Sequence, residues 1–466
     1  MKQFNNLTII LGLLILSLFS LVFPKAGFAN EKVNKFGIHI LDPSDLKNAQ
    51  ELVNSSGGDW GWVTVVIRDD DMNFDKWQNF MDECRECHLV PLVRIATHLE
   101  GTNWIKPKIE DAANWADFLD RLNWPIKDRN IIFFNEPNHA KEWGGETNPQ
   151  EYGRILSDFS SKFKIQNTKY KILNAGLDLA APNGKETMEA FKFMQQMNFE
   201  VPGIFEKLDG WTSHSYPNHG FLGKPWENGK TSVRGYEWEL NILKNTFKVS
   251  RDLPVFITET GWPKSGKGNK YYDEKTVAEY IKYAFENVWL KDERVKAVTP
   301  FVLNYPQDLF DEFSWFDKKG QPYPQCETVK NIEKVSWWPE QEKKYEIVSI
   351  LLPPFLPANT KFNGKLTLKN VGQSILGEQG SIEIPAIPSE NLLISPLVVP
   401  NNQKIKPGEI TILDFSITST SKSGEYTFNW ENLPIQKIKV FPASILSQAR
   451  YNFWEKIILK IKRVFD

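Results

Sequence analysis

The sequence of 466 residues predicts a (β/α)8 barrel, followed by an all-β sandwich of immunoglobulin-like type and a short C-terminal amphipathic helix. The barrel is predicted because short apolar runs alternate with amphipathic segments eight times over residues 33–335. Several of these runs are apolar throughout, which is typical of parallel strands covered on both faces. Because no glycine-rich phosphate loop follows any run, a barrel is favoured over an open dinucleotide-binding sheet.

The barrel strands are expected in order along the chain, separated by helices. They are predicted at residues 36–41, 62–68, 90–96, 131–135, 172–177, 210–215, 255–259 and 298–305. Apolar residues at helical spacing indicate amphipathic helices between them, most clearly over residues 152–163 and 277–288. The chain is therefore expected to form one α/β catalytic-type domain over residues 33–335.

The character of the sequence changes after the Trp337-Trp338-Pro339 segment. Over residues 343–441 short alternating runs are separated by turn dipeptides such as Asn363-Gly364 and Pro407-Gly408, and no helical period occurs. This pattern predicts a β-sandwich of immunoglobulin-like type that lacks the cysteine pair of antibody domains. Sugar-binding modules and inert spacers share this architecture, and a spacer is favoured.

Both ends of the chain carry apolar segments. Residues 1–29 have Lys2 before an apolar run and end in Gly27-Phe28-Ala29, which predicts a signal peptide, with an uncleaved N-terminal anchor as the alternative. In either case the chain is expected to be secreted or associated with the cell envelope, outside the cytoplasm.

Residues 444–466 predict a basic amphipathic helix that binds a membrane surface or packs on the protein's own domains. Its expected apolar positions are Trp454, Ile458, Ile461 and Phe465, and its polar face carries Lys456, Lys460, Lys462 and Arg463.

Composition limits the classes of partner. A formal charge of −2 gives no reason to expect nucleic acid, whereas 17 tryptophans suggest either stacking on sugar rings or a tryptophan-rich core.

The segment Cys84-Arg85-Glu86-Cys87-His88 matches a c-type haem attachment pattern, but both cysteines lie on the apolar face of a predicted helix, so core positions are favoured. Asp69, Asp70 and Asp71 lack the spacing of a calcium loop. No metal and no cofactor are expected.

Two of the predicted strands deliver a glutamate at their carboxyl end. An apolar strand leads through Asn135 to Glu136 and is stopped by Pro137, and another ends at Glu259. A charge at the end of a buried strand must be paired or hydrogen-bonded, and active sites of barrels lie at this end of the strands. Two facing carboxyl groups can cleave a glycosidic bond, although a strand-end glutamate can also cap a helix or pair with arginine.

The triplet Asn135-Glu136-Pro137 on strand four, with Glu259 on strand seven, resembles the glycoside hydrolases of clan A, the cellulase-, mannanase- and xylosidase-like barrels. The resemblance implies that Glu136 is the acid/base, Glu259 the nucleophile, and Asn135 the ligand of a sugar 2-hydroxyl. It covers the barrel alone.

Further positions follow from the same resemblance. Strand six ends in a sequence similar to the clan's His-x-Tyr motif, which implies that Tyr216 orients the nucleophile and that His214 assists, with a satisfied core histidine as the alternative. Arg68 resembles the clan's arginine that contacts the nucleophile, or else forms a solvated turn with the aspartates that follow it.

Aromatic residues for sugar stacking are expected near strands seven and eight. Trp262 lies in a segment that also resembles the nucleophile region of endo-1,3-glucanases. Many clan members carry a tryptophan platform on strand eight, where this chain offers Tyr305, with Trp315 further on.

The sequence as a whole predicts an exported, monomeric, retaining glycosidase acting on a β-linked polysaccharide or oligosaccharide. A non-catalytic carbohydrate-binding or envelope protein on the same scaffold is the main alternative, and a haem protein is the third. The sugar, the linkage and the direction of the reaction stay open.

Overall fold

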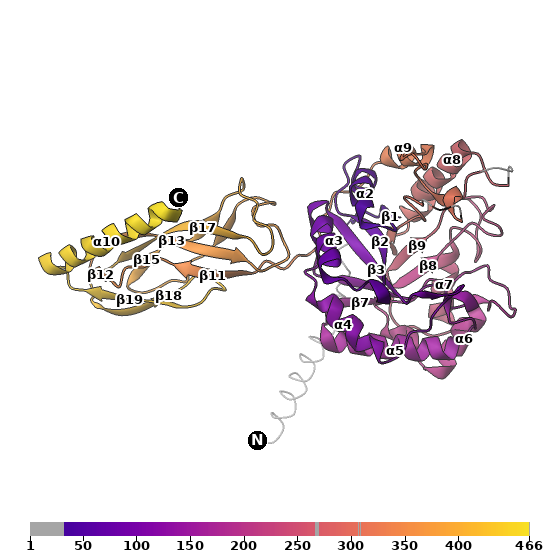
Figure 1. Cartoon of the computed structure of the whole chain (residues 1–466), viewed down its shortest axis with the longest axis horizontal. Coiled ribbons are helices and arrows are strands. Elements are labelled where there is room, and N and C mark those ends of the chain that lie inside the picture. Colours follow the sequence, from indigo (N-terminus) through magenta and orange to yellow (C-terminus); the bar gives the residue numbers. More distant parts are fainter. Residues whose placement is uncertain (1–31, 266–269, 306, 308, 466) are drawn as a thin grey trace, which may run out of the picture.

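The computed structural model describes residues 32–265, 270–305, 307 and 309–465. Two regions lie along the long axis of the molecule, an α/β region and a β-rich region that carries the C-terminal helix (Figure 1). The predicted signal peptide or anchor at residues 1–29 lies outside the described residues. Among the helices that are described, none is both long and apolar enough to span a membrane.

Eight parallel strands form the centre of the α/β region. Five pair in the order β1-β2-β3-β6-β7 and three in the order β10-β9-β8. Parallel bridges between Leu173 and Gly210, and between Phe36 and Val298, join the two sheets at both edges, so the pairing continues round a ring. The strands are β1 (Gly37–His39), β2 (Gly61–Arg68), β3 (Leu89–Ala96), β6 (Arg129–Phe133), β7 (Tyr170–Leu173), β8 (Trp211–His214), β9 (Val255–Glu259) and β10 (Val295–Val298).

The first seven predicted strands overlap those of the structure, but the eighth was misplaced. It was predicted over residues 298–305, whereas β10 ends at Val298. Pro300 has no N–H to donate to a strand ladder, so the apolar residues after it form a loop. Val302 and Leu303 are fully buried in that loop and therefore resemble a strand in the sequence.

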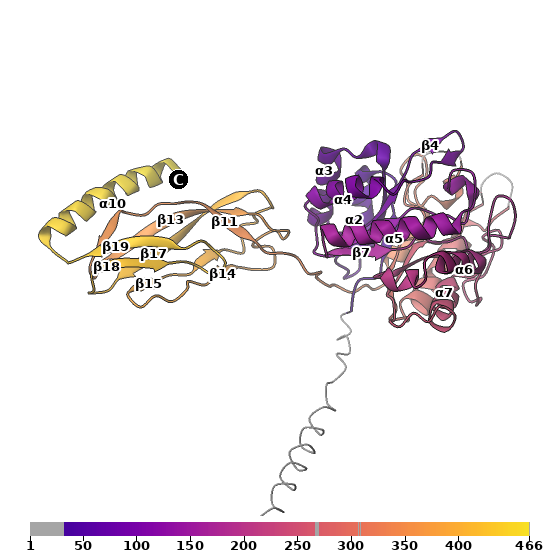
Figure 2. The same cartoon turned by 90° about the horizontal axis from the view of Figure 1, so that it is seen from below.

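Helices cover the outside of the ring (Figure 2). They are α2 (Leu46–Val53), α3 (Phe74–Glu86), α4 (Asp111–Arg121), α5 (Pro149–Gln166), α6 (Ala190–Glu200), α7 (Gly235–Asn245), α8 (Glu274–Ala284) and α9 (Pro324–Lys330). Side chains at their starts satisfy free backbone N–H groups: Asn148 accepts from the N–H of Glu151 at α5, and Asp273 from that of Thr276 at α8.

Short elements complete this region. They are a hairpin of β4 (Leu99–Glu100) and β5 (Asn103–Trp104), the 3-10 turns at Pro43–Asp45, Asp69–Asp71, Ala140–Glu142, Ile204–Lys207 and Asp311–Phe313, and a π-helical turn at Phe285–Trp289. Cys84, Cys87 and Cys326 are free and buried, as expected of core positions.

The second region consists of β-strands and one helix. Its largest sheet has the order β11-β13-β17-β15, a second has the order β12-β19-β18, and β14 pairs with β16. Alternate residues of β13 and β17 are buried, so one face of this sheet lies on the core. The elements are β11 (Tyr345–Ile350), β12 (Phe355–Pro357), β13 (Lys361–Asn370), β14 (Ile382–Ile384), β15 (Leu392–Ile394), β16 (Leu397–Val399), β17 (Ile410–Ser419), β18 (Gly424–Phe428), β19 (Gln436–Phe441) and α10 (Ile445–Phe465).

The two regions meet at the amino ends of the ring strands. Trp337 stacks on Trp62 near the start of β2, with ring centroids 6.0 Å apart, and its indole N–H donates to the Trp60 carbonyl at 2.7 Å. Gln373 of the second region donates to the Ile126 carbonyl at 2.8 Å, and Arg85 of α3 donates back to the Gln373 carbonyl at 2.6 Å. The carboxyl ends of the strands therefore face away from the β-rich region.

Candidate active site

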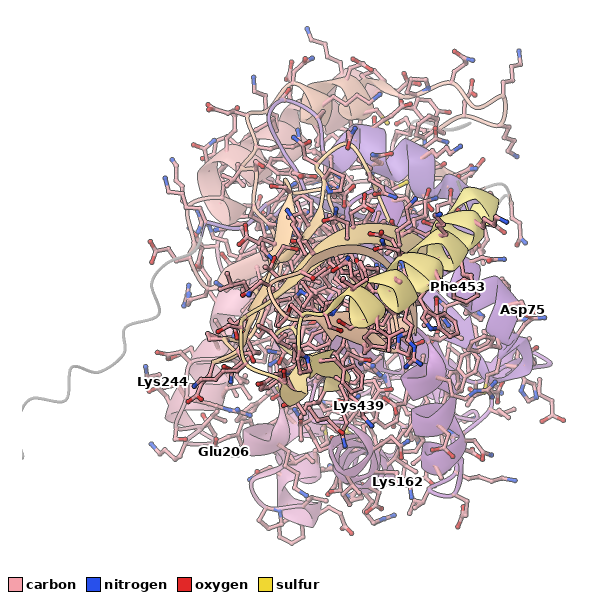
Figure 3. The ribbon with its side chains drawn as sticks, turned by 90° about the vertical axis from the view of Figure 1, so that its left-hand side faces the viewer. Asp75, Lys162, Glu206, Lys244, Lys439 and Phe453 are labelled. Carbon is pink, nitrogen blue, oxygen red and sulfur yellow. The ribbon has the colours of Figure 1, made fainter. Side chains whose placement is uncertain are left out.

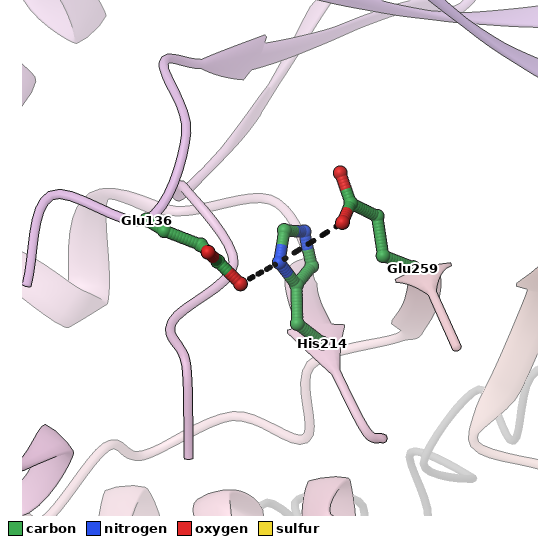
Figure 4. Close-up of side chains that lie close together, drawn as sticks. All are labelled: Glu136, His214 and Glu259. Atoms are coloured by element: carbon green, nitrogen blue, oxygen red, sulfur yellow. Dashed lines mark hydrogen bonds and ion pairs between the residues drawn. The ribbon is translucent and has the colours of Figure 1, made fainter. Parts of the chain in front are cut away.

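The carboxyl ends of β6 and β9 bring the two predicted glutamates together. Glu259 is the last residue of β9, and Glu136 follows the end of β6 at Phe133. One carboxylate oxygen of each, together with one ring nitrogen of His214, all lie within 4.8 Å of one another (Figure 4). The sequence placed these glutamates at the ends of strands four and seven, and the clan resemblance implied that they act together.

The backbone that presents Glu136 adopts an unusual conformation. Phe134 has a φ of 72° and Glu136 a φ of 27°, in the left-handed range that residues with a side chain rarely adopt. Such residues cost about 1–3 kcal/mol each and persist where their surroundings hold them. Here the N–H of Glu136 donates to the Gly176 carbonyl at 3.1 Å, and the N–H of His139 donates to the Glu136 carbonyl at 2.8 Å.

His214, the last residue of β8, lies buried beneath both carboxylates. Its Nδ1 is 2.9 Å from Oε1 of Glu136 and 3.8 Å from Oε2 of Glu259. Burial lowers the pKa of His214, but the charges of Glu259 and Glu136 outweigh burial and raise it overall. The imidazole ring needs Gly176, because a Cβ atom at that position would lie 2.1 Å from the His214 Cδ2 atom.

Two donors hold the carboxylate of Glu259. Arg94 donates from Nη1 to Oε1 at 2.7 Å, and the Tyr216 hydroxyl donates to Oε2 at 3.2 Å. Burial raises the pKa of Glu259, but His214 and Arg94 together lower it to about 2. The nearby His39 stays neutral, since burial lowers its pKa to about 3. Glu259 is therefore an anion at neutral pH.

The arginine that contacts Glu259 is not the predicted one. Arg68 lies at the surface end of β2, where its side chain is 46% exposed and pairs with Asp70 at 2.8 Å. Arg94 lies within β3 and points into the ring. The sequence did contain a signal for Arg94, because it is a charged residue inside an apolar run. A buried arginine requires a partner, so this position could have been expected to face an acidic group.

The three aspartates after β2 all have cationic or imidazole partners. Asp70 pairs with Arg68, Asp71 with Lys76 at 2.5 Å, and Asp69 with His98 at 2.9 Å. They form a surface turn held by ion pairs.

A cavity of about 420 Å³ opens above the glutamates. Tyr305 lines it, as predicted, but Trp262 and Trp315 do not, because each is only 3% exposed and packs in the core of the α/β region. Trp262 donates its indole N–H to the Gly223 carbonyl at 2.8 Å, on the far side of the turn at Gly261. The aromatic residues that line the cavity without having been predicted are Trp104, Phe134, Trp143, Phe221, Phe301, Phe310 and Phe313.

Polar side chains line the cavity as well. Asn135 accepts from Nη1 of Arg94 at 2.6 Å and donates to Oε2 of Glu142 at 3.3 Å. Burial, and then the charge of Glu136, raise the pKa of Glu142. Glu142 lies in the loop after β6, outside any strand pattern, which explains why the sequence did not indicate it. His139 and Asp178, bonded at 2.8 Å, also line the cavity.

Glu136, His214 and Glu259 are also the residues best placed to hold a metal ion. Their surroundings do not favour one, because the guanidinium of Arg94 already places a positive charge 2.7 Å from Glu259. Both oxygens of Glu259 already accept hydrogen bonds from protein donors, Arg94 and Tyr216.

No protein-family model and no curated protein sequence matches this chain. Solved structures with similar folds include a glucosidase from Croceicoccus marinus, with 9% identity over 84% of this chain and 96% of that one, and a TM-score of 0.49. A monomeric β-xylosidase from Caulobacter crescentus has 10% identity over the same shares, with a TM-score of 0.45. An endo-β-1,3-glucanase of GH128 subgroup II from Sorangium cellulosum has 14% identity over 64% of this chain and 98% of that one, with a TM-score of 0.42.

All three of these structures are named as glycoside hydrolases, which is the class that the sequence resembles.

Proposed function

We propose that this chain is a retaining glycoside hydrolase that cleaves β-linked glycans by double displacement. The observation that carries the proposal is the approach of the two carboxyl groups, with one oxygen of each within 4.8 Å of the other. Retaining glycosidases place these groups about 5–5.5 Å apart, whereas inverting enzymes need about 6.5–9.5 Å to admit a water molecule.

The environments of the two glutamates suit different steps. Glu259, kept anionic by Arg94 and His214, attacks the anomeric carbon and forms a glycosyl ester. Glu136 gives its proton to the leaving glycosidic oxygen in the same step. In the second step Glu136 takes a proton from water, and the resulting attack on the anomeric carbon releases the sugar and regenerates the Glu259 carboxylate.

The neighbouring side chains would position the sugar. Asn135 keeps one amide N–H beyond the bond that it donates to Glu142, and this N–H is available to a sugar hydroxyl. Aromatic rings such as Phe301 and Trp104 on the cavity wall offer flat apolar faces to sugar rings. No metal or cofactor takes part in this mechanism.

The finer parts of the proposal concern the architecture and the location of the enzyme. We propose that the ring of strands is a (β/α)8 barrel over residues 33–335, that the β-rich region is an immunoglobulin-like sandwich, and that the enzyme is monomeric and works outside the cytoplasm. The bridges that join both edges of the ring support the barrel. The location outside the cytoplasm rests on the sequence alone.

The proposal is tested on β-glucans, mannans, xylans and galactans. Purified protein should release reducing ends from at least one polymer, and a slow 2-fluoro glycoside of the corresponding sugar should leave a covalent adduct on Glu259 that peptide mass spectrometry detects. Binding of a glycan without turnover would instead identify a non-catalytic carbohydrate-binding protein. Inversion at the anomeric carbon, followed by NMR, would refute the retaining mechanism.

A further inference from the structure

The C-terminal helix α10 is only half covered by the region on which it packs. Tyr451 and Ile458 are 2% and 4% exposed and join the core of the β-rich region. On the outer side Leu446 is 62% and Phe453 60% exposed, and Trp454, at the flank of the docked face, is 40% exposed. Leu446 and Phe453 are seven residues apart, so they lie along one stripe of the helix, and Figure 3 shows Phe453 pointing away from the ribbon.

Charge is distributed unequally between the two sides. Arg450, Lys456 and Lys460 are exposed, whereas the one acid of the described helix, Glu455, accepts from the Tyr451 hydroxyl at 3.1 Å next to the docked face. The outer side therefore combines bulky apolar groups with cations only. The predicted positions Ile461 and Phe465 lie outside the described side chains.

We propose that α10 binds the surface of an anionic lipid bilayer, with Phe453 and Trp454 entering the headgroup layer. Tryptophan and phenylalanine beside lysine and arginine are typical of helices that lie in this interface, where the cations meet lipid phosphates. A helix that served only to cover the β-rich region would turn its large apolar side chains inward, as Tyr451 and Ile458 do, and would have no need of an exposed aromatic pair.

This attachment leaves the cavity at a distance from the lipid-binding helix. The β-rich region contacts the amino ends of the ring strands, whereas the glutamates lie at the carboxyl ends, so the ring of strands separates α10 from the cavity. In Figure 1 α10 and helix α8 lie at opposite ends of the long axis.

The test uses the full-length chain with one environment-sensitive fluorophore. The native cysteines are buried, so a cysteine introduced at the exposed Ala449, one turn before Phe453, is the reactive one. Vesicles of phosphatidylcholine with about one third phosphatidylglycerol should shift the emission of this label to the blue and make it quenchable by nitroxide lipids. A label at Lys244→Cys, 69% exposed on α7, should not change.

Charge variants complete the experiment. Lys456→Glu combined with Lys460→Glu should lower partitioning of the Ala449 label onto these vesicles by at least about tenfold, since two cations that attract lipid phosphates become anions that repel them. The control pair Lys162→Glu and Lys244→Glu removes the same charge from the α/β region and should leave partitioning unchanged.

Three outcomes would overturn the proposal. The first is an Ala449 label whose emission does not change when anionic vesicles are added. The second is equal partitioning of the protein onto anionic vesicles and onto vesicles of pure phosphatidylcholine. The third is a blue shift of the label without lipid, which would show that self-association of the protein buries it. Residues 1–31 are common to every variant, so the difference between the α10 charge variant and the control pair reports on α10.

Discussion

Glu136 and Glu259 face the same cavity from β6 and β9, but these two parts of its wall hold their carboxyl groups in different ways. Glu259 ends a regular strand and receives hydrogen bonds from Arg94 and Tyr216. Glu136 lies beyond its strand on a left-handed backbone and contacts His214. Both carboxylates therefore lie beside the titratable imidazole of His214, and Glu259 has the fixed charge of Arg94 in addition, which favours the anionic form that a nucleophile needs.

The largest expected effect is the loss of the β9 carboxylate. Glu259→Ala should lower kcat by at least about 10⁴-fold, because removal of a nucleophile abolishes the covalent route. Glycan binding, measured by calorimetry, should persist within a few fold. A variant that still turns over at the wild-type rate would show that the two glutamates have no such division of roles.

Loss of the β6 carboxyl group should depend on the leaving group. Glu136→Gln should lower kcat by about 10²- to 10⁴-fold on a natural glycan, but much less on an aryl glycoside whose phenolate leaves without a proton. Hydrolysis rates on both substrates measure this contrast. An equal loss on both would assign Glu136 to binding.

Removal of the positive charge beside Glu259 tests its anionic state. Glu259 has a pKa lowered to about 2, so the deprotonated form persists well into acid, and Arg94→Met should raise this pKa. The acid limb of the kcat/KM profile should then move to higher pH, and activity at pH 7 should fall by about 10²-fold. Arg68→Met removes the same side chain from the surface of β2 and should leave the profile unchanged.

A smaller effect is expected from the hydroxyl that donates to Glu259. Tyr216→Phe keeps the ring and removes one hydrogen bond to a charged group, which is worth about 1.5–3 kcal/mol, so kcat should fall by about 10- to 100-fold. Circular dichroism should show an unchanged fold, and an unaltered kcat would indicate that the hydroxyl has no part in orienting the carboxylate.

The smallest catalytic effect is expected from a tryptophan that the sequence assigned to the cavity. Trp262→Phe should lower the free energy of unfolding by about 1–3 kcal/mol, because it leaves a core void and the Gly223 carbonyl unpaired. KM should change little. Phe301→Ala, at the cavity wall, should show the reverse pattern, with a raised KM and a smaller loss of stability.

Much of the α/β region follows from local pattern. Parallel strands buried on both faces leave apolar runs, so seven of them could be located from the sequence, and strand order then placed Glu136 and Glu259 at one end of the ring. The eighth strand was misplaced because Val302 and Leu303 are as apolar as a strand while forming a loop. Asn135 and Tyr216 line the cavity and His214 lies beneath it, which places all three positions of the clan resemblance near the glutamates.

The sequence by itself determined which carboxyl groups meet, since a parallel ring brings the ends of its strands to one place whatever the loops do. Only the tertiary structure decided which side chains surround them. Arg68 and Arg94 both lie on apolar strands, and Trp262 and Phe301 both follow strand ends, so local pattern cannot separate them. Whether each turns toward the cavity, the core or the solvent depends on partners distant in the chain, such as Glu259 for Arg94 and Gly223 for Trp262.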